Sequence, residues 1–290
     1  MIVDIHTHVF DPSAHFGKTL LDDLALCRVD PSLWRDASER LLETTRAADV
    51  AVVFGLCARA TGWEIPNDYV ASHVAQAPDR LLFFAAIDPA DPACIDELSR
   101  CHSTLGAVGV KLSPLYSGVH PCDPRSKAIY RYCQANGLPI LFHTGTSFVG
   151  HTPLDYSRPV HFDAVACEFT ELRMVLAHIG HPWEGECIAT IRRHPHVYAD
   201  LSALYYRPWQ FYNSMRLLVE YRADHKLLFG SDYPFTTTGS SLEGVRNLNH
   251  VLGSSGLPPI PSEVIEGVIH RDTLRLLGLP DPRKNHASAP

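Results

Sequence analysis

The sequence predicts an α/β protein that folds as one (β/α)8 barrel of the TIM type. Apolar, β-branched runs alternate with helical patterns, and eight such units fit into 290 residues. A barrel of this kind typically needs roughly 250 residues. The competing arrangement is a doubly wound open sheet, which usually carries a G-x-G-x-x-G turn after its first strand. Here the first run ends in His-Thr-His and no such turn follows it, so the barrel is favoured.

Eight runs are expected to be the strands. Most are continuously apolar rather than alternating, which is typical of parallel strands that are covered on both faces. The runs are residues 2–6, 50–56, 80–88, 106–113, 138–145, 173–180, 197–203 and 226–234.

Helical patterns lie between these runs. In the first, Leu33 and Leu41 belong to one apolar stripe. In the second, Asn67 is a candidate N-cap. The third begins with Pro124 and ends at Gly137, the usual asymmetry of helix start and stop. The predicted helices are residues 32–50, 67–78, 124–137, 161–172, 185–195 and 242–253.

The pattern predicts a single barrel domain over residues 1–280 and a polar tail over residues 281–290 that frays. Two connections are longer than usual strand–helix loops. Residues 10–31 are expected to cover the top of the barrel, and residues 145–159 follow the fifth strand.

Composition restricts the partners. The chain is 46% hydrophobic and carries a formal net charge of −7, which argues against nucleic acid and anionic membrane and favours a small-molecule substrate. No run resembles a secretory signal or reaches the roughly 18–20 apolar residues of a membrane span. The eight cysteines form no C-x-x-C pair, so we expect reduced thiols in a cytoplasmic protein. The sequence neither predicts nor excludes a homo-oligomer.

Polar residues stand where the predicted strands end, and in a barrel the active site lies at the carboxyl ends of the strands. His6 and His8 end the first run. Residues i and i+2 of a strand point to the same face, so both imidazoles can bind one cation. The other candidates at strand ends are Lys111, His143, His178, His181 and Asp232.

Each of these residues also has an ordinary structural interpretation. A His-x-His pair on a strand often binds nothing, His143 can be a hydrogen-bonded core residue, and Asp232 before Tyr-Pro can be a turn residue. Their coincidence favours a site, because five strand ends converge only in a closed barrel. Burying several imidazoles there without a shared partner would cost stability. Imidazole suits zinc and related metals, and metal-bound water has a pKa of roughly 7.

The motifs DIHTHVF, GVKLSP, LPILFHTG, VLAHIGHPW and LLFGSDYPF occur in this order. As a set they resemble the amidohydrolase superfamily, and within it the amidohydrolase-2 branch that includes aminocarboxymuconate-semialdehyde decarboxylase. The resemblance extends from Met1 to about Leu279. It implies a distorted barrel of the metal-dependent-hydrolase type with one or two divalent metals.

The resemblance also implies roles for particular residues. His6, His8, His143 and Asp232 match the metal ligands. His178 matches a histidine that is catalytic beside one metal or binds a second metal. Lys111 would either be carboxylated and bridge two metals, or stay a cation that binds a substrate carboxylate or a structural partner. We expect one Zn²⁺, with Mn²⁺ or Fe²⁺ as alternatives, and two metals if Lys111 is carboxylated.

Two reactions use this residue set, with Asp232 and His178 as the catalytic residues. The first expectation is a hydrolase that directs metal-activated water at a lactone, ester or amide of a small, carboxylated molecule. The alternative is a nonoxidative decarboxylase, a carboxy-lyase of an unsaturated or aromatic acid, and a non-catalytic barrel is a third hypothesis. Arg207 is either a carboxylate-binding residue or an ordinary surface arginine. The predicted substrate contacts are Phe10, His181, Trp183, Glu184 and Tyr233.

Overall fold

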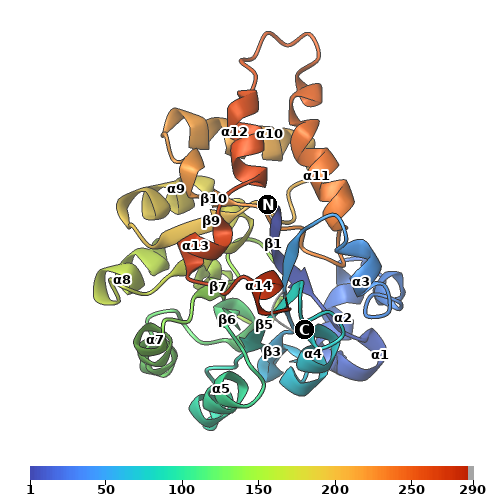
Figure 1. Cartoon of the computed structure of the whole chain (residues 1–290), viewed down its shortest axis with the longest axis vertical. Coiled ribbons are helices and arrows are strands. Elements are labelled where there is room, and N and C mark those ends of the chain that lie inside the picture. Colours follow the sequence, from blue (N-terminus) through green and yellow to red (C-terminus); the bar gives the residue numbers. More distant parts are fainter. Residues whose placement is uncertain (287–290) are drawn as a thin grey trace.

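The computed structural model describes residues 1–286, and its core is a sheet of eight parallel strands ringed by helices (Figure 1). All eight predicted strands are confirmed. In sheet order they are β1 (Val3–His8), β2 (Val50–Phe54), β5 (Leu81–Ala86), β6 (Gly109–Leu112), β7 (Ile140–Phe142), β8 (Met174–Leu176), β9 (Val197–Asp200) and β10 (Leu227–Leu228).

The barrel is nearly closed, and its seam lies between β10 and β1. Irregular backbone hydrogen bonds join the two sides there: Ile5 donates to the Phe229 carbonyl at 3.0 Å, and Asp232 donates to the His6 carbonyl at 2.8 Å. On its other edge, β1 pairs with β2 through a register shift between Asp4 and Thr7. Such irregularities re-aim side chains next to active sites, and this one lies beside His6.

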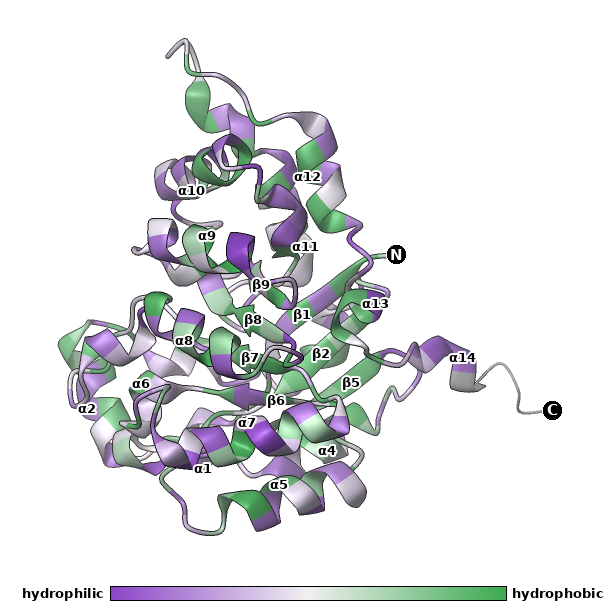
Figure 2. Ribbon diagram, turned by 90° about the vertical axis from the view of Figure 1, so that its left-hand side faces the viewer, coloured by the Kyte–Doolittle hydropathy of each residue, from purple (hydrophilic) through white to green (hydrophobic). Residues whose placement is uncertain are grey.

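Apolar residues fill both faces of the sheet, and Figure 2 shows them on the central strands. Along β2, Val50, Val52 and Phe54 belong to the smaller of two core clusters, whereas Ala51 and Val53 pack in the larger one. Because successive side chains of a strand point to opposite faces of the sheet, alternate residues of β2 pack in two different layers. This is expected for strands that are buried on both faces.

Helices follow the strands around the barrel. The longer ones are α4 (Asn67–Val74), α5 (Cys94–Ser103), α7 (Pro124–Asn136), α8 (Val160–Glu168), α9 (Glu184–Arg193), α10 (Pro208–Glu220), α11 (Thr238–Arg246) and α12 (Ser262–Ile269). The predicted ends of α7 are confirmed, because Pro124 is its first residue and Gly137 ends it in the left-handed conformation. Helices α5, α10 and α12 were not predicted. Within residues 1–286, no helix is both long and apolar enough to span a bilayer.

The predicted helix at residues 32–50 is wrong. The structure has a 3-10 turn at Pro31–Trp34, further turns, and the single-turn helix α3 (Leu41–Thr44). Asp30 caps the first turn by accepting a hydrogen bond from the Ser32 amide, and Leu33 is 77% exposed. Local capping therefore overrides the apolar stripe.

Two other details of the helix predictions are corrected. Asn67 is the first residue of α4 rather than its N-cap, and its side-chain amide pairs with the backbone N–H and carbonyl of Ala86. The predicted helix at 242–253 begins earlier, at the Thr237 capping box of α11, and is followed by a separate 3-10 segment at Leu248–Leu252.

The long connection after β1 covers the carboxyl end of the barrel, as predicted. It forms α1 (Pro12–His15) and α2 (Lys18–Leu26), and Cys27 and Val29 reach the central cavity. A two-stranded hairpin of β3 (Cys57–Ala58) and β4 (Trp63–Glu64) supports it through the backbone bond from Gly17 to Gly62. Part of the predicted tail is the short helix α14 (Pro282–His286). The rest, residues 287–290, lies outside the described residues.

Candidate active site

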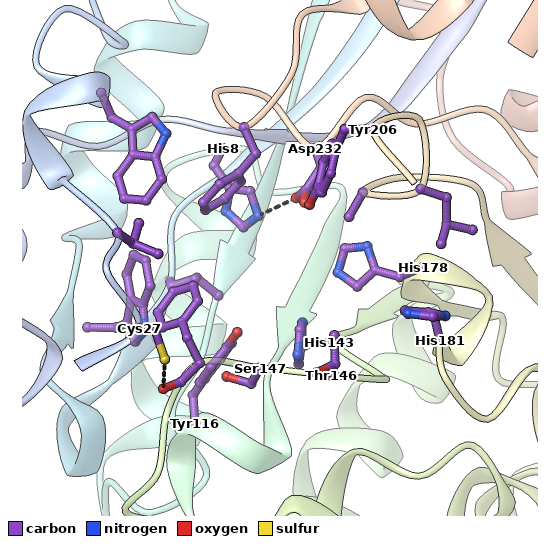
Figure 3. Close-up of a pocket in the computed structure, with 18 of the residues that line it drawn as sticks. His8, Cys27, Tyr116, His143, Thr146, Ser147, His178, His181, Tyr206 and Asp232 are labelled. Carbon is purple, nitrogen blue, oxygen red and sulfur yellow. Dashed lines mark hydrogen bonds and ion pairs between the residues drawn. The ribbon is translucent and has the colours of Figure 1, made fainter. Parts of the chain in front are cut away.

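A cavity of about 450 Å³ opens at the carboxyl ends of the strands. Six predicted site residues line it, and Figure 3 shows five of them facing the same space, with His181 at its edge beyond His178. The six are His8, Lys111, His143, His178, His181 and Asp232, and all but Lys111 are labelled in the figure.

Three donor atoms form a compact triangle at the cavity floor. His6 Nε2 lies 3.2 Å from His8 Nε2 and 3.2 Å from Asp232 Oδ1, and His8 Nε2 lies 3.4 Å from the same oxygen. Donors bound tetrahedrally to one zinc at roughly 2.0–2.2 Å would be separated from each other by about 3.3–3.6 Å. The triangle therefore fits one divalent ion with only small shifts of the donors.

The electrostatics of the triangle also suit a cation. Burial lowers the pKa of His8 to about 3, although the hydrogen bond that His8 donates to Asp232 opposes this shift. Burial alone would raise the pKa of Asp232, but the nearby imidazoles of His6 and His178 and the hydrogen bond from His8 hold it well below its usual range. Neutral imidazole and ionised carboxylate are the forms that bind metals.

His143 lies in the same cavity but outside the triangle. Its ring packs 4.6 Å from the ring of Tyr116 and 5.3 Å from the ring of His178, measured between centroids. Its Nε2 is buried and has no hydrogen-bond partner, which is a costly state for a polar atom. The predicted role of His143 as a fourth ligand stays a prediction.

Asp200, at the end of β9, is a site residue that the sequence analysis missed. Its carboxylate accepts a hydrogen bond from His6 Nδ1 at 2.9 Å and another from the His178 backbone N–H at 3.0 Å. A donated Nδ1 proton leaves the lone pair of His6 on Nε2, the atom in the triangle. The available signal was an aspartate inside the seventh predicted run (197–203), just as Asp232 lies inside the eighth (226–234).

His178 is held in a fixed orientation beside the triangle. Its Nδ1 lies 2.7 Å from Ser202 Oγ and 3.2 Å from the Ser202 carbonyl, so Nε2 is the nitrogen left for the cavity. Burial lowers the pKa of His178 to about 4. Both His178 (φ 60°) and Asp232 (φ 66°) adopt the left-handed backbone conformation, and such strain gathers at functional sites.

Lys111 reaches the triangle from β6. It is 2% exposed, and its Nζ lies 3.2 Å from His6 Nε2 and 4.7 Å from the centre of the Phe54 ring. Burial lowers the pKa of Lys111 to about 7, although Asp200 and Asp232 oppose that shift. A second possible metal group, formed by His6, His178 and Asp200, shares His6 with the triangle.

Of the five predicted substrate contacts, only His181 lines the cavity. Phe10 instead packs 5.2 Å from the Phe16 ring in the core beneath the loops. The Tyr233 hydroxyl donates to the Ala37 carbonyl at 2.5 Å. Glu184 accepts from His181 Nδ1 at 2.8 Å, so it orients His181 rather than facing the cavity.

The walls come largely from residues that the sequence analysis did not select as substrate contacts. They are mostly apolar or aromatic, and Trp183 is not among them. They include Trp34, Leu56, Trp63, Tyr116, Phe148, Leu204, Tyr206 and Phe235. Most stand on loops, so their convergence depends on loop conformation rather than on strand ends. Arg207, which the sequence analysis considered as a carboxylate-binding residue, also lines the cavity.

A (β/α)8 barrel with an imidazole–carboxylate cluster at the carboxyl ends of its strands defines a protein of the metal-dependent barrel-enzyme class. The sequence model of the amidohydrolase family matches residues 3–279. The chain therefore belongs to the amidohydrolase family, and the resemblance drawn from the motifs is confirmed.

Three proteins that are similar to this chain have names that state a reaction. The chain is 21% identical over 350 residues to 2-amino-3-carboxymuconate-6-semialdehyde decarboxylase of Dictyostelium discoideum, covering 97% of this chain and 92% of the relative. Its fold is similar to that of a probable 2-pyrone-4,6-dicarboxylic acid hydrolase of Acinetobacter baumannii (TM-score 0.68, 17% identity, 96% and 99% of the two chains). It is also similar to that of 5-carboxyvanillate decarboxylase of Sphingomonas paucimobilis (TM-score 0.65, 17% identity, 96% and 99%).

Proposed function

We propose that the protein is a metal-dependent, nonoxidative decarboxylase of a small unsaturated or aromatic carboxylic acid. The observation that carries the proposal is the donor triangle of His6, His8 and Asp232 at the floor of an aromatic-walled cavity. A flat, conjugated acid fits such walls, and the decarboxylase relative supports this reaction over the others.

The metal site is part of the proposal. His6, His8 and Asp232 would hold one divalent ion, with Zn²⁺ the expected metal and Mn²⁺ or Fe²⁺ as alternatives, and His143 would approach as a further ligand. When bound, the ion would supply Lewis-acid stabilisation of negative charge on a substrate oxygen. Asp200 fixes the tautomer of His6, and Lys111 adds a donor beside the same nitrogen.

The chain's own residues account for the proton that decarboxylation requires. Loss of carbon dioxide breaks a carbon–carbon bond, leaves the electron pair on the substrate carbon and requires a proton at that carbon. We assign its delivery to His178: Ser202 holds Nδ1–H, so Nε2 faces the cavity with its lone pair, takes up a proton from solvent water and passes it to the substrate carbon. The aromatic walls would keep the substrate flat and limit the access of water.

Hydrolysis of a lactone, ester or amide is the second candidate. The same triangle, which includes Asp232, would together with the nearby His178 be suited to holding and deprotonating a water molecule. The structural similarity to a probable dicarboxylic acid hydrolase supports this reading. Each of the three named relatives or structures has a carboxylated molecule in its name, so a carboxylated substrate is common to both candidates.

The deciding experiment is a substrate screen on metal-replete protein. Unsaturated and aromatic carboxylic acids, lactones and amides are offered in parallel while carbon dioxide release and ring or amide opening are followed. We expect carbon dioxide in equal amount to the acid consumed. His178→Ala should keep its metal and lose at least about 100-fold in turnover. Metal-dependent opening of a lactone or amide with no carbon dioxide would contradict the decarboxylase proposal and establish the hydrolase.

A further inference from the structure

A separate group of possible metal ligands lies on the outer helices, away from the cavity. Asp163 and Cys167 stand on α8, and His194 directly follows the last residue of α9. One donor atom from each of the three residues lies within 4.8 Å of the other two. None of these three residues lines the cavity, so this outer donor group is independent of the donor triangle.

Helix geometry and packing bring the outer donor group together. Asp163 and Cys167 are four residues apart, which places them one turn apart on the same face of α8. Helices α8 and α9 pack against each other on the outside of the barrel (Figure 1). The buried Lys226 donates from Nζ to the His194 carbonyl at 2.8 Å and to the Pro195 carbonyl at 2.7 Å, which fixes the backbone that carries the His194 ring.

Two of the three donors already face each other. His194 Nε2 lies 2.8 Å from Asp163 Oδ1. Within the described residues, His194 Nδ1 makes no hydrogen bond, so this nitrogen can carry the ring proton when Nε2 binds an ion. Arg193 Nη1 lies 3.2 Å from the Asp163 carboxylate, but the arginine side chain is 63% exposed. A metal ion can therefore displace this arginine into solvent.

The combination of donor types selects the kind of ion. A thiolate, an imidazole and a carboxylate together suit Zn²⁺ and the metals that resemble it, whereas Mg²⁺ and Ca²⁺ prefer oxygen ligands alone. Sulfur and nitrogen bound tetrahedrally to one zinc would lie roughly 3.6 Å apart. Cys167 is an exposed, free thiol, so rotation about its Cα–Cβ bond can bring Sγ to this distance.

The ordinary interpretation of this group is a surface ion pair of Asp163 with His194 beside an unrelated thiol. Such a pair contributes little to stability and does not require a cysteine. The thiol of Cys167 stands one helical turn from Asp163 and makes no hydrogen bond within residues 1–286. The convergence of three different donor types from two helices favours a metal site.

We propose that Asp163, Cys167 and His194 form a zinc site that links α8 to α9, with water as the fourth ligand. Binding releases the Cys167 thiol proton to the solvent and leaves the ring proton of His194 on Nδ1 instead of Nε2. The bound ion stabilises the folded protein, because only the folded chain brings the three donors together. This site takes no part in the chemistry of the cavity and does not depend on the proposed function.

Cobalt(II) distinguishes this site from the donor triangle, because a thiolate ligand gives an intense thiolate-to-cobalt charge-transfer band in the near ultraviolet. The triangle offers only imidazole and carboxylate donors. Reduced, metal-free protein is titrated with Co²⁺ and then with Zn²⁺. We expect the band to appear with cobalt, to disappear as zinc displaces the cobalt, and to be absent in Cys167→Ser. His194→Gln should weaken the cobalt binding that produces the band at least about 10-fold.

Cys27→Ser is the matched control. Cys27 is the other exposed cysteine, and it lines the cavity, so this variant tests whether a thiol of the cavity produces the band. We expect the band to remain in Cys27→Ser. Melting temperatures give a second readout, because zinc should raise that of the wild type more than that of Cys167→Ser.

A wild type without the band, or a band that survives in Cys167→Ser, would overturn the proposal. Loss of the band in Cys27→Ser would also overturn it, because the thiolate ligand would then lie in the cavity. Unchanged cobalt affinity in His194→Gln would reduce the group to a surface thiol that binds metal without the imidazole, which contradicts the proposed site.

Discussion

At the scale of single residues, Asp200 controls which nitrogen of His6 faces the donor triangle. One of its oxygens accepts from His6 Nδ1, and the other accepts from the backbone N–H groups of His178 and Ser202. An asparagine has only one acceptor oxygen, and it would accept the hydrogen bonds of the two backbone N–H groups. The amide NH₂ would then face His6 Nδ1 and favour the tautomer whose proton sits on Nε2.

Asp200→Asn should therefore lower metal affinity by about 10–100-fold, the usual effect of removing a hydrogen-bond partner of a metal-binding histidine. Competition with a chromophoric chelator measures the change. Asp23→Asn is the matched control, because Asp23 also pairs with a histidine, His151 Nδ1 at 3.0 Å, but away from the donor triangle and from every candidate metal group of the described residues. Unaltered zinc affinity in Asp200→Asn would contradict the assigned role.

His143 supplies a second prediction at this scale. Its buried, unpartnered Nε2 is explained if the imidazole moves to join the metal when one is bound. His143→Ala should then lower zinc affinity at least about 10-fold. His181→Ala is the control, because His181 lines the same cavity but is paired with Glu184 and should retain zinc. If the two variants bind zinc equally well, His143 is not a ligand.

At the scale of elements, the loop after β7 depends on Gly145. Its φ is 90°, and a Cβ there would lie 3.1 Å from His181 N and closer still to the His181 carbonyl oxygen. Thr146 donates to that same carbonyl at 2.7 Å. The close approach of two loop backbones therefore fixes the position of His181 in the cavity.

Gly145→Ala should displace His181 and lower turnover at least about 10-fold while the barrel still folds. The left-handed backbone alone costs about 1 kcal/mol for a residue with a Cβ. Gly137→Ala isolates that cost, because Gly137 also has a positive φ of 68° but nothing within 4 Å of the added Cβ. Turnover and melting temperature of the two variants are compared. Equal turnover in both would show that the contact with His181 does not matter.

The elements also show what a sequence can predict. The eight strands were found because burial on both faces makes each one a continuous apolar run. The apolar stripe at residues 32–50 led to a wrong helix prediction, because a cap at Asp30 and a series of turns take the place of the helix. His6, His8 and Asp232 were identified by their place at strand ends, which the barrel brings together. The aromatic walls and the packing role of Phe10 depend on how loops fold over that end, which a pattern of apolar residues does not encode.

At the scale of the whole molecule, the site costs stability when no metal is bound. Buried imidazoles stay neutral in the folded chain, because burial lowers the pKa of His178 to about 4 and that of His8 to about 3. In the unfolded chain both would titrate near 6.5. Between these values the unfolded state binds more protons, so stability falls as the pH falls.

Metal-free protein should therefore lose several kcal/mol of unfolding free energy between pH 6.5 and pH 4, since each unit of pKa difference corresponds to about 1.4 kcal/mol. Asp200 and Asp232, whose pKa values are held below the usual range, add to the loss only as the pH drops below about 4.

Urea unfolding of chelator-treated protein at pH 7.5, 6.0 and 5.0 measures the slope of the unfolding free energy against pH. His178→Gln removes one of three buried imidazoles, since burial also lowers the pKa of His143 well below its usual value, and should make the slope clearly shallower. Replacing the surface residue His225 with Gln should leave the slope unchanged. A stability that is flat from pH 7.5 to 5.0 would show that these histidines are protonated in the folded protein, and that the cavity is more open to water than its burial indicates.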